Sequence, residues 1–147
     1  MEPLTFRVYC DRHRKKWYVV RIFAAKKEMY AWNKEDGYEN RDKKDRYLGL
    51  TRAHEVWTIY PKRSKKKDKK SGEIGSISFV VDHTTSGIVS HECTHAALYW
   101  FLCTHKKLEK LNNPDYDEKF AWVQGNLVRQ VWMHWFKAEK AGRLTSK

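Results

Sequence analysis

Residues 84–98 read TTSGIVSHECTHAAL, and this stretch has the features of a helix that carries functional side chains. Its first three residues carry hydroxyl groups, which commonly cap a helix by accepting hydrogen bonds from the first backbone N–H groups. No glycine or proline occurs between Ile88 and His105. The stretch therefore predicts a helix from Ile88 to about His105, with about four to five turns.

The centre of this predicted helix carries the motif His91-Glu92-x-x-His95. Residues four apart lie about one turn apart on the same helix face, so the two imidazoles can converge on one ion. Glu92 is then placed to act as the general base of a zinc hydrolase. We expect Zn²⁺ bound by His91 and His95. The alternative is a pair of surface histidines that only pack or hydrogen-bond.

A hydrolytic zinc site usually has three protein ligands and a water, so a third ligand is needed. Residues 112–115 read NNPD and should end the first helix, and a second helix is predicted from about Tyr116 to Ala141. Its first turn contains Glu118, which we predict to be the third ligand. Asp115 and Asp117 are rival ligands; Asp117 points about 100° away from Glu118, and Asp115 is also a candidate cap.

The choice of Glu118 rests on the face of the second helix that contains it. Steps of three and four residues from Glu118 give a stripe that should pack on the first helix, and small residues in it should permit close approach. The stripe consists of Ala121, Gly125, Val128, Trp132 and Trp135.

The remainder of the chain predicts strands and one short helix. Apolar and polar residues alternate from Leu4 to Cys10, and residues 17–23 are rich in aromatic and β-branched side chains, as in strands. A short amphipathic helix is expected at 24–34 and a charged surface loop at 35–46. Residues 56–60 should form a strand that pairs antiparallel with residues 74–81. The expected fold is α+β, with a small mixed or antiparallel sheet of about four strands packed on the two helices.

The strongest charge feature is the run from Lys62 to Lys70, in a chain with a net charge of +12. It has no apolar periodicity, so we expect a basic surface loop at about 61–73 that connects the two paired strands. Such a loop is either a solvated hairpin tip or a docking patch for nucleic acid or an acidic partner.

Size and composition favour one domain over residues 1–147. The three cysteines form no CxxC pair, so neither a disulfide framework nor a cysteine zinc site is expected. No signal peptide or membrane-spanning segment is recognisable, which predicts a cytoplasmic protein without a membrane partner. The oligomeric state does not follow from the sequence.

The motif and Glu118-Lys119-Phe120-Ala121 together resemble the zincin metallopeptidases. The Glu-x-x-Ala string is similar to the third-ligand motif of gluzincins and of ImmA/IrrE-type peptidases, and the arrangement looks like minimal zincin-like proteins of phages and mobile elements. The resemblance covers about residues 74–135. It implies a zincin-like fold and a zinc metallopeptidase that acts on a protein or peptide.

Three functions follow as hypotheses. The first is a zinc peptidase whose positive surface recruits an acidic or nucleic-acid-bound protein substrate, with Glu92 as the general base. The second is a basic nucleic-acid-binding or inhibitory protein with a structural zinc site, and the third is a hydrolase of non-peptide amides. Only the second predicts that function survives the loss of the Glu92 carboxylate.

Overall fold

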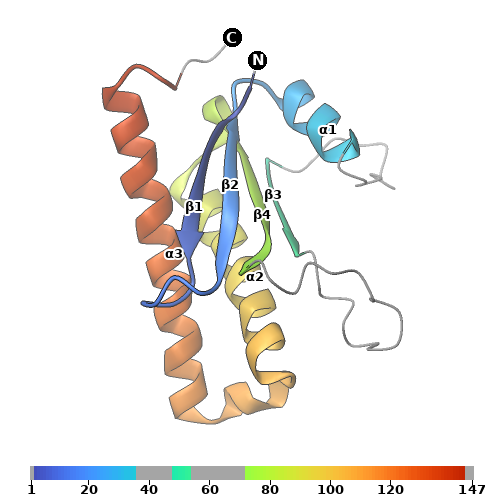
Figure 1. The fold of residues 1–147 in the computed structure, drawn as a ribbon, viewed down its shortest axis with the longest axis vertical. Coiled ribbons are helices and arrows are strands. Elements are labelled where there is room, and N and C mark those ends of the chain that lie inside the picture. The colour runs from blue at the N-terminus through green and yellow to red at the C-terminus, as the bar shows by residue number, and fades with distance from the viewer. Residues whose placement is uncertain (1, 36–47, 54–71, 145–147) are drawn as a thin grey trace.

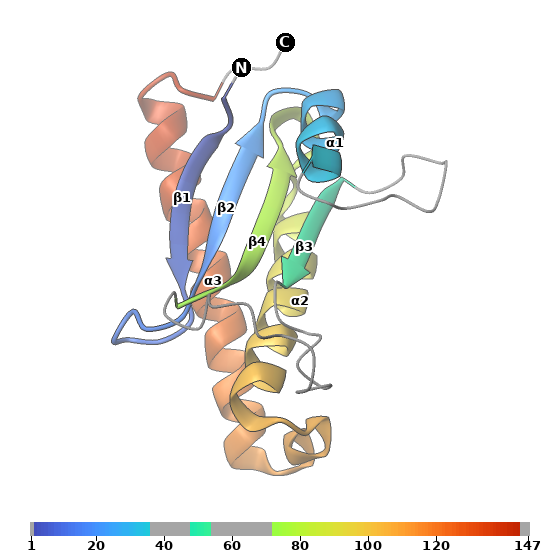
Figure 2. The same cartoon turned by 45° about the vertical axis from the view of Figure 1, so that its right-hand side comes forward.

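The computed structural model describes residues 2–35, 48–53 and 72–144. These residues form an α+β arrangement in which a four-stranded mixed sheet is covered on one face by two long helices (Figures 1 and 2). In chain order the elements are β1 (Leu4–Tyr9), β2 (Trp17–Phe23), α1 (Lys26–Glu35), β3 (Gly49–Ala53), β4 (Glu73–Val80), α2 (Ser86–His105) and α3 (Pro114–Lys140), with 3₁₀ turns at Val81–His83 and Leu108–Asn112.

The strand order is β1-β2-β4-β3. The β1–β2 and β3–β4 pairs are antiparallel, whereas β2 and β4 run parallel. The predicted strands at 4–10, 17–23 and 74–81 are confirmed as β1, β2 and β4. The predicted strand at 56–60 lies outside the described residues, as do the loops expected at 35–46, apart from Glu35, and at 61–73, apart from its last two residues.

The antiparallel partner of β4 is β3, with Gly49 opposite Phe79 and Thr51 opposite Ile77. The predicted pairing of residues 56–60 with β4 was wrong, because β2 and β3 occupy its two sides. The β3 strand has no clear sequence signal, because Gly49, Thr51 and Arg52 interrupt the apolar alternation within its five residues. Its position matters for function, since β3 is an edge of the described sheet and α2 packs beside it.

Both long helices begin as their sequences indicate. Thr85 caps α2, accepting a hydrogen bond from the Ile88 N–H at 3.3 Å. Asn113 caps α3 by accepting a hydrogen bond from the Asp115 N–H at 2.9 Å, and Pro114 follows as the first helical residue. The capping role considered for Asp115 therefore belongs to Asn113. Within the described ranges, no helix combines the length and the apolar character needed to cross a membrane.

The main core lies between the sheet and the two long helices. Tyr18 of β2 is fully buried, and its hydroxyl donates a 2.8 Å hydrogen bond to the carbonyl oxygen of Ala96 in α2. This bond satisfies both buried polar groups and fixes α2 against the sheet. The same core contains fully buried apolar side chains from the sheet and both helices, including Val20, Ile77, Phe79, Val89, Leu127 and Val131.

The packing face of α3 differs from the predicted stripe. Its buried residues are Val123, Leu127, Val131, Trp135 and Ala138. Ala121 and Gly125 are exposed, and a Cβ atom added to Gly125 would meet nothing within 4 Å. The prediction of close helix contact through these small residues was wrong, because the larger β-branched and aliphatic residues at 123, 127 and 131 bury more apolar area.

This packing predicts that Gly125→Ala stabilises the protein. Alanine restricts the unfolded chain and exposes less helix backbone, which should raise the free energy of unfolding by about 0.5–1 kcal/mol. Urea denaturation followed by circular dichroism measures the change. A loss of stability would show instead that Gly125 faces another element closely.

Candidate metal centre

The two histidines of the motif converge on the outer side of α2. Their Nε2 atoms lie 3.1 Å apart, and the ring planes are inclined at 84°. Two imidazoles bound to one tetrahedral zinc, with bonds of about 2.0–2.1 Å, would have their nitrogens about 3.3 Å apart. The pair therefore fits two neighbouring ligand positions. The same separation suits a hydrogen bond between neutral imidazoles when no metal is bound.

The surroundings of the pair come from α2 itself and from α3. His91 is exposed and His95 is half-buried, and the Tyr99 ring stacks on His95 with centroids 6.3 Å apart. Beside His91, Ser90 accepts a 3.3 Å hydrogen bond from the side-chain amide of Gln124 in α3. This contact places α3 beside Ser90, the residue before His91, while the His91 side chain itself is exposed.

Glu92 points in a different direction, toward the sheet edge. Its side chain is only 6% exposed, and in the described part of the chain it is the one charged residue that is buried. The Thr51 hydroxyl of β3 donates to its Oε2 atom at 2.6 Å and also lies 2.9 Å from its backbone carbonyl oxygen. A buried carboxylate is costly without such partners, so this short bond to a charged acceptor holds Glu92 in place.

The close approach of β3 to Glu92 requires a glycine. A Cβ atom at Gly49 would lie 2.8 Å from Cγ of Glu92 and 3.1 Å from Cγ2 of Ile88, closer than packed atoms tolerate. Gly49 and Thr51 are therefore part of the site, although sequence reasoning did not select them. Their only signal was a glycine two residues before a threonine in a segment too short to show periodicity.

Cys93, between the motif residues, belongs to the core. It is fully buried, and burial raises the pKa of its thiol to about 12, with the negative charge of Glu92 as a second cause. The thiol is consequently protonated near neutral pH and is a poor nucleophile. Cys93 therefore packs in the main core.

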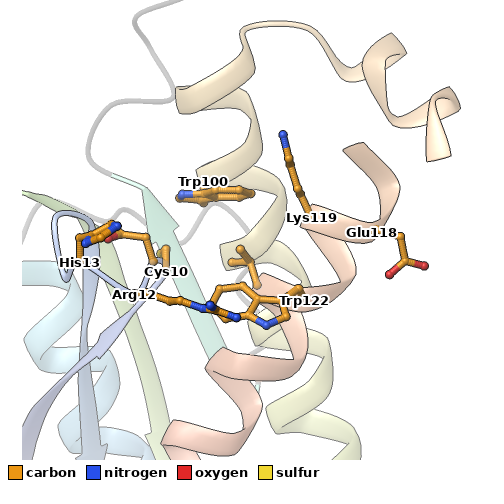
Figure 3. Close-up of a pocket in the computed structure, with 9 residues that line it drawn as sticks. Cys10, Arg12, His13, Trp100, Glu118, Lys119 and Trp122 are labelled. Carbon is orange, nitrogen blue, oxygen red and sulfur yellow. The ribbon is translucent and has the colours of Figure 1, made fainter. Parts of the chain in front are cut away.

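The structure does not bring Glu118 to the histidines. Glu118 is exposed near the start of α3, and Figure 3 shows its carboxylate turned away from Trp100 and Trp122. No group of three histidine, cysteine, aspartate or glutamate side chains that could hold a metal occurs among residues 2–35, 48–53 and 72–144. The packing of α3 through Val123 and Leu127 directs Glu118 to solvent, and its role as a ligand stays a prediction.

Replacing Thr51 tests the link between β3 and Glu92. Thr51→Val keeps the shape of the side chain but leaves Oε2 of Glu92 without its donor, which should lower the free energy of unfolding by about 1.5–3 kcal/mol. Thr51→Ser is the matched control, because it keeps the hydroxyl. Chemical denaturation measures the free energy of unfolding of both variants. If both lose the same amount of stability, the Thr51 hydroxyl does not stabilise the fold.

Comparison with protein-family models, with curated proteins and with solved structures found no match to this chain. The site must therefore be interpreted from its own geometry. That geometry consists of two convergent imidazoles, a buried carboxylate on the same helical turn, and an edge strand that contacts the carboxylate.

Proposed function

We propose that this chain is a zinc-dependent peptidase of zincin-like type, with His91 and His95 as metal ligands and Glu92 as the general base. The observation that carries the proposal is the 3.1 Å separation of the two Nε2 atoms beside a buried, hydrogen-bonded Glu92. Bound zinc would supply a water of lowered pKa and a Lewis acid for the scissile carbonyl. The residues of the chain bind the zinc and move the protons.

The third ligand in this proposal is Glu118. Its side chain is exposed, so turning toward α2 would sacrifice no buried packing. The contact between Gln124 and Ser90 already holds α3 beside the residue that precedes His91. Carboxylate oxygen is an ordinary zinc ligand and would complete a set of two histidines and one glutamate.

Glu92 has two carboxylate oxygens with separate tasks. Oε2 accepts the hydrogen bond from Thr51, which fixes the plane of the carboxylate. We assign the proton of the attacking water to Oε1, from which it passes to the leaving amine as the peptide bond breaks. Because Thr51 and the close approach of Gly49 restrict the side chain, Glu92 is preorganised for this transfer.

A peptide is the favoured substrate because of the edge strand. The described sheet ends at β3, where an extended segment could add as a further strand through backbone hydrogen bonds. The edge is β3 and not β4, because β4 lies between β2 and β3. Since Thr51 contacts Glu92 directly, a strand paired with β3 would pass close to the proposed base.

Metal retention and hydrolysis, measured together, test the proposal. Wild type should bind one zinc per chain by elemental analysis, and His95→Ala should lose it, whereas His13→Ala, which changes an exposed turn residue, should not. Glu92→Gln should keep the zinc but cleave a quenched fluorescent peptide library at least about a hundredfold more slowly, because a general base contributes about 10²–10⁴-fold.

Two outcomes would contradict the proposal. If wild type binds no zinc, or if His95→Ala binds as much zinc as wild type, the histidine pair is not a metal site. If Glu92→Gln retains zinc and cleaves peptides at the wild-type rate, Glu92 is not the base.

A further inference from the structure

A groove runs between the β1–β2 turn and α3, and neither His91 nor His95 lines it. It consists of two adjoining cavities of about 520 and 440 Å³, which share Asp11, Arg12 and Trp122 in their walls. The first extends to Trp100 of α2, and the second extends along α3 to His134. Of the residues in the catalytic proposal, Glu118 also lines the first cavity, but its carboxylate is turned outward, and His91, Glu92 and His95 line neither cavity (Figure 3).

Broad aromatic surfaces line the groove. Trp100 and Trp122 lie on opposite sides of the first cavity in Figure 3. Trp122 is 44% exposed, so part of its ring is open to a ligand in the groove. Tyr9 and His134 continue the line of rings through the second cavity.

The same walls carry an excess of positive charge. The basic side chains are Arg12, Arg14, Lys119 and Arg129, all of them exposed. Two carboxylates also line the groove, but both are directed elsewhere. The oxygens of Asp11 accept hydrogen bonds from the backbone N–H groups of Lys15 and Lys16, at 3.1 and 2.9 Å, and Glu118 is turned outward (Figure 3).

Arginines and rings are paired along the groove. The Arg12 guanidinium lies 5.6 Å from the centre of the Trp122 ring, and that of Arg14 lies 5.1 Å from the centre of the Tyr9 ring. Each pair places a cation beside a planar apolar surface. Single-stranded nucleic acid presents the matching alternation, because a phosphate follows every base.

Hydrogen bonds hold the second cavity in shape. The Gln130 side chain accepts from the Tyr9 N–H at 2.9 Å and donates to the Tyr9 carbonyl at 2.8 Å, so it pairs with the outer edge of β1 as a neighbouring strand would. Arg129 donates to Oδ1 of Asn126 at 3.1 Å, which orients its guanidinium on α3. The groove is therefore preformed, which lowers the entropic cost of binding.

We propose that this groove binds single-stranded nucleic acid, with bases stacked on Trp122 and its neighbouring rings and phosphates contacted by Arg12, Arg14 and Arg129. An acidic peptide would use the charges but has no need of the exposed Trp122 face. In double-stranded nucleic acid the faces of the bases are stacked on one another, so they cannot stack on Trp122 or the neighbouring rings. The site differs from the basic run at residues 62–70, which lies outside the described residues.

The test uses the full chain and a fluorescein-labelled dT15 oligonucleotide, with binding measured by fluorescence anisotropy. Trp122→Leu should weaken binding about 5- to 150-fold, the range expected for losing one stacked base, and Trp122→Phe should retain most of the affinity. Trp32→Leu is the matched control: Trp32 is 38% exposed on α1 and pairs with Arg21 at 5.3 Å, away from the groove. It should leave binding unchanged.

The salt dependence of binding tests the phosphate contacts separately. Each contact to a single strand contributes about 0.7 to the slope of log affinity against log salt, so Arg12→Ala with Arg14→Ala should reduce the slope by about 1.4. Equal affinities of Trp122→Leu and wild type, or equal losses in Trp122→Leu and Trp32→Leu, would overturn the proposal. Polyglutamate should displace labelled dT15 much less effectively than unlabelled dT15 does. If the two competitors are equally effective, the proposal is overturned in favour of an acidic protein partner.

Discussion

The hydrogen bond between Thr51 and Glu92 joins the sheet edge to the motif helix, and the proposed chemistry depends on it. A carboxylate that is 6% exposed has lost most of its contact with water, and the 2.6 Å bond from Thr51 replaces part of that solvation. The bond forms only because β3 has glycine at position 49, where a side chain would collide with Glu92. One short strand thus decides both where the carboxylate points and how freely it can move.

On the side of α2 that faces the core, packing fixes how the helix is rotated. Cys93 and Ala96 are fully buried, and the Tyr18 hydroxyl binds the carbonyl of Ala96, so the rotation of α2 about its axis is fixed. His91 and His95 must then project away from the sheet. Successive helix residues are turned by about 100°, which places the two histidines on a different face from Cys93 and Ala96. The two imidazoles meet at 3.1 Å because they lie one turn apart on the same face of α2.

Local pattern was sufficient for the features that lie within one element. The motif helix, its threonine cap and the strands β1, β2 and β4 could be predicted because capping and periodicity are short-range signals. The face of α3 could not be predicted from small residues alone, since tertiary packing chose Val123 and Leu127 instead. Thr51 and Gly49 were missed because their role arises from a contact with Glu92 about 40 residues away along the chain, which no local pattern encodes.

X-ray absorption at the zinc K-edge of the purified, zinc-loaded protein tests the central claim most directly, because it identifies the ligand atoms. The account predicts the multiple-scattering pattern of two imidazoles, with nitrogen and oxygen ligands at about 2.0–2.2 Å and no sulfur. It also predicts that the imidazole pattern is lost when His91 and His95 are replaced together. Sulfur scattering at about 2.3 Å, or an unchanged spectrum after replacement of both histidines, would place the metal elsewhere and contradict the account.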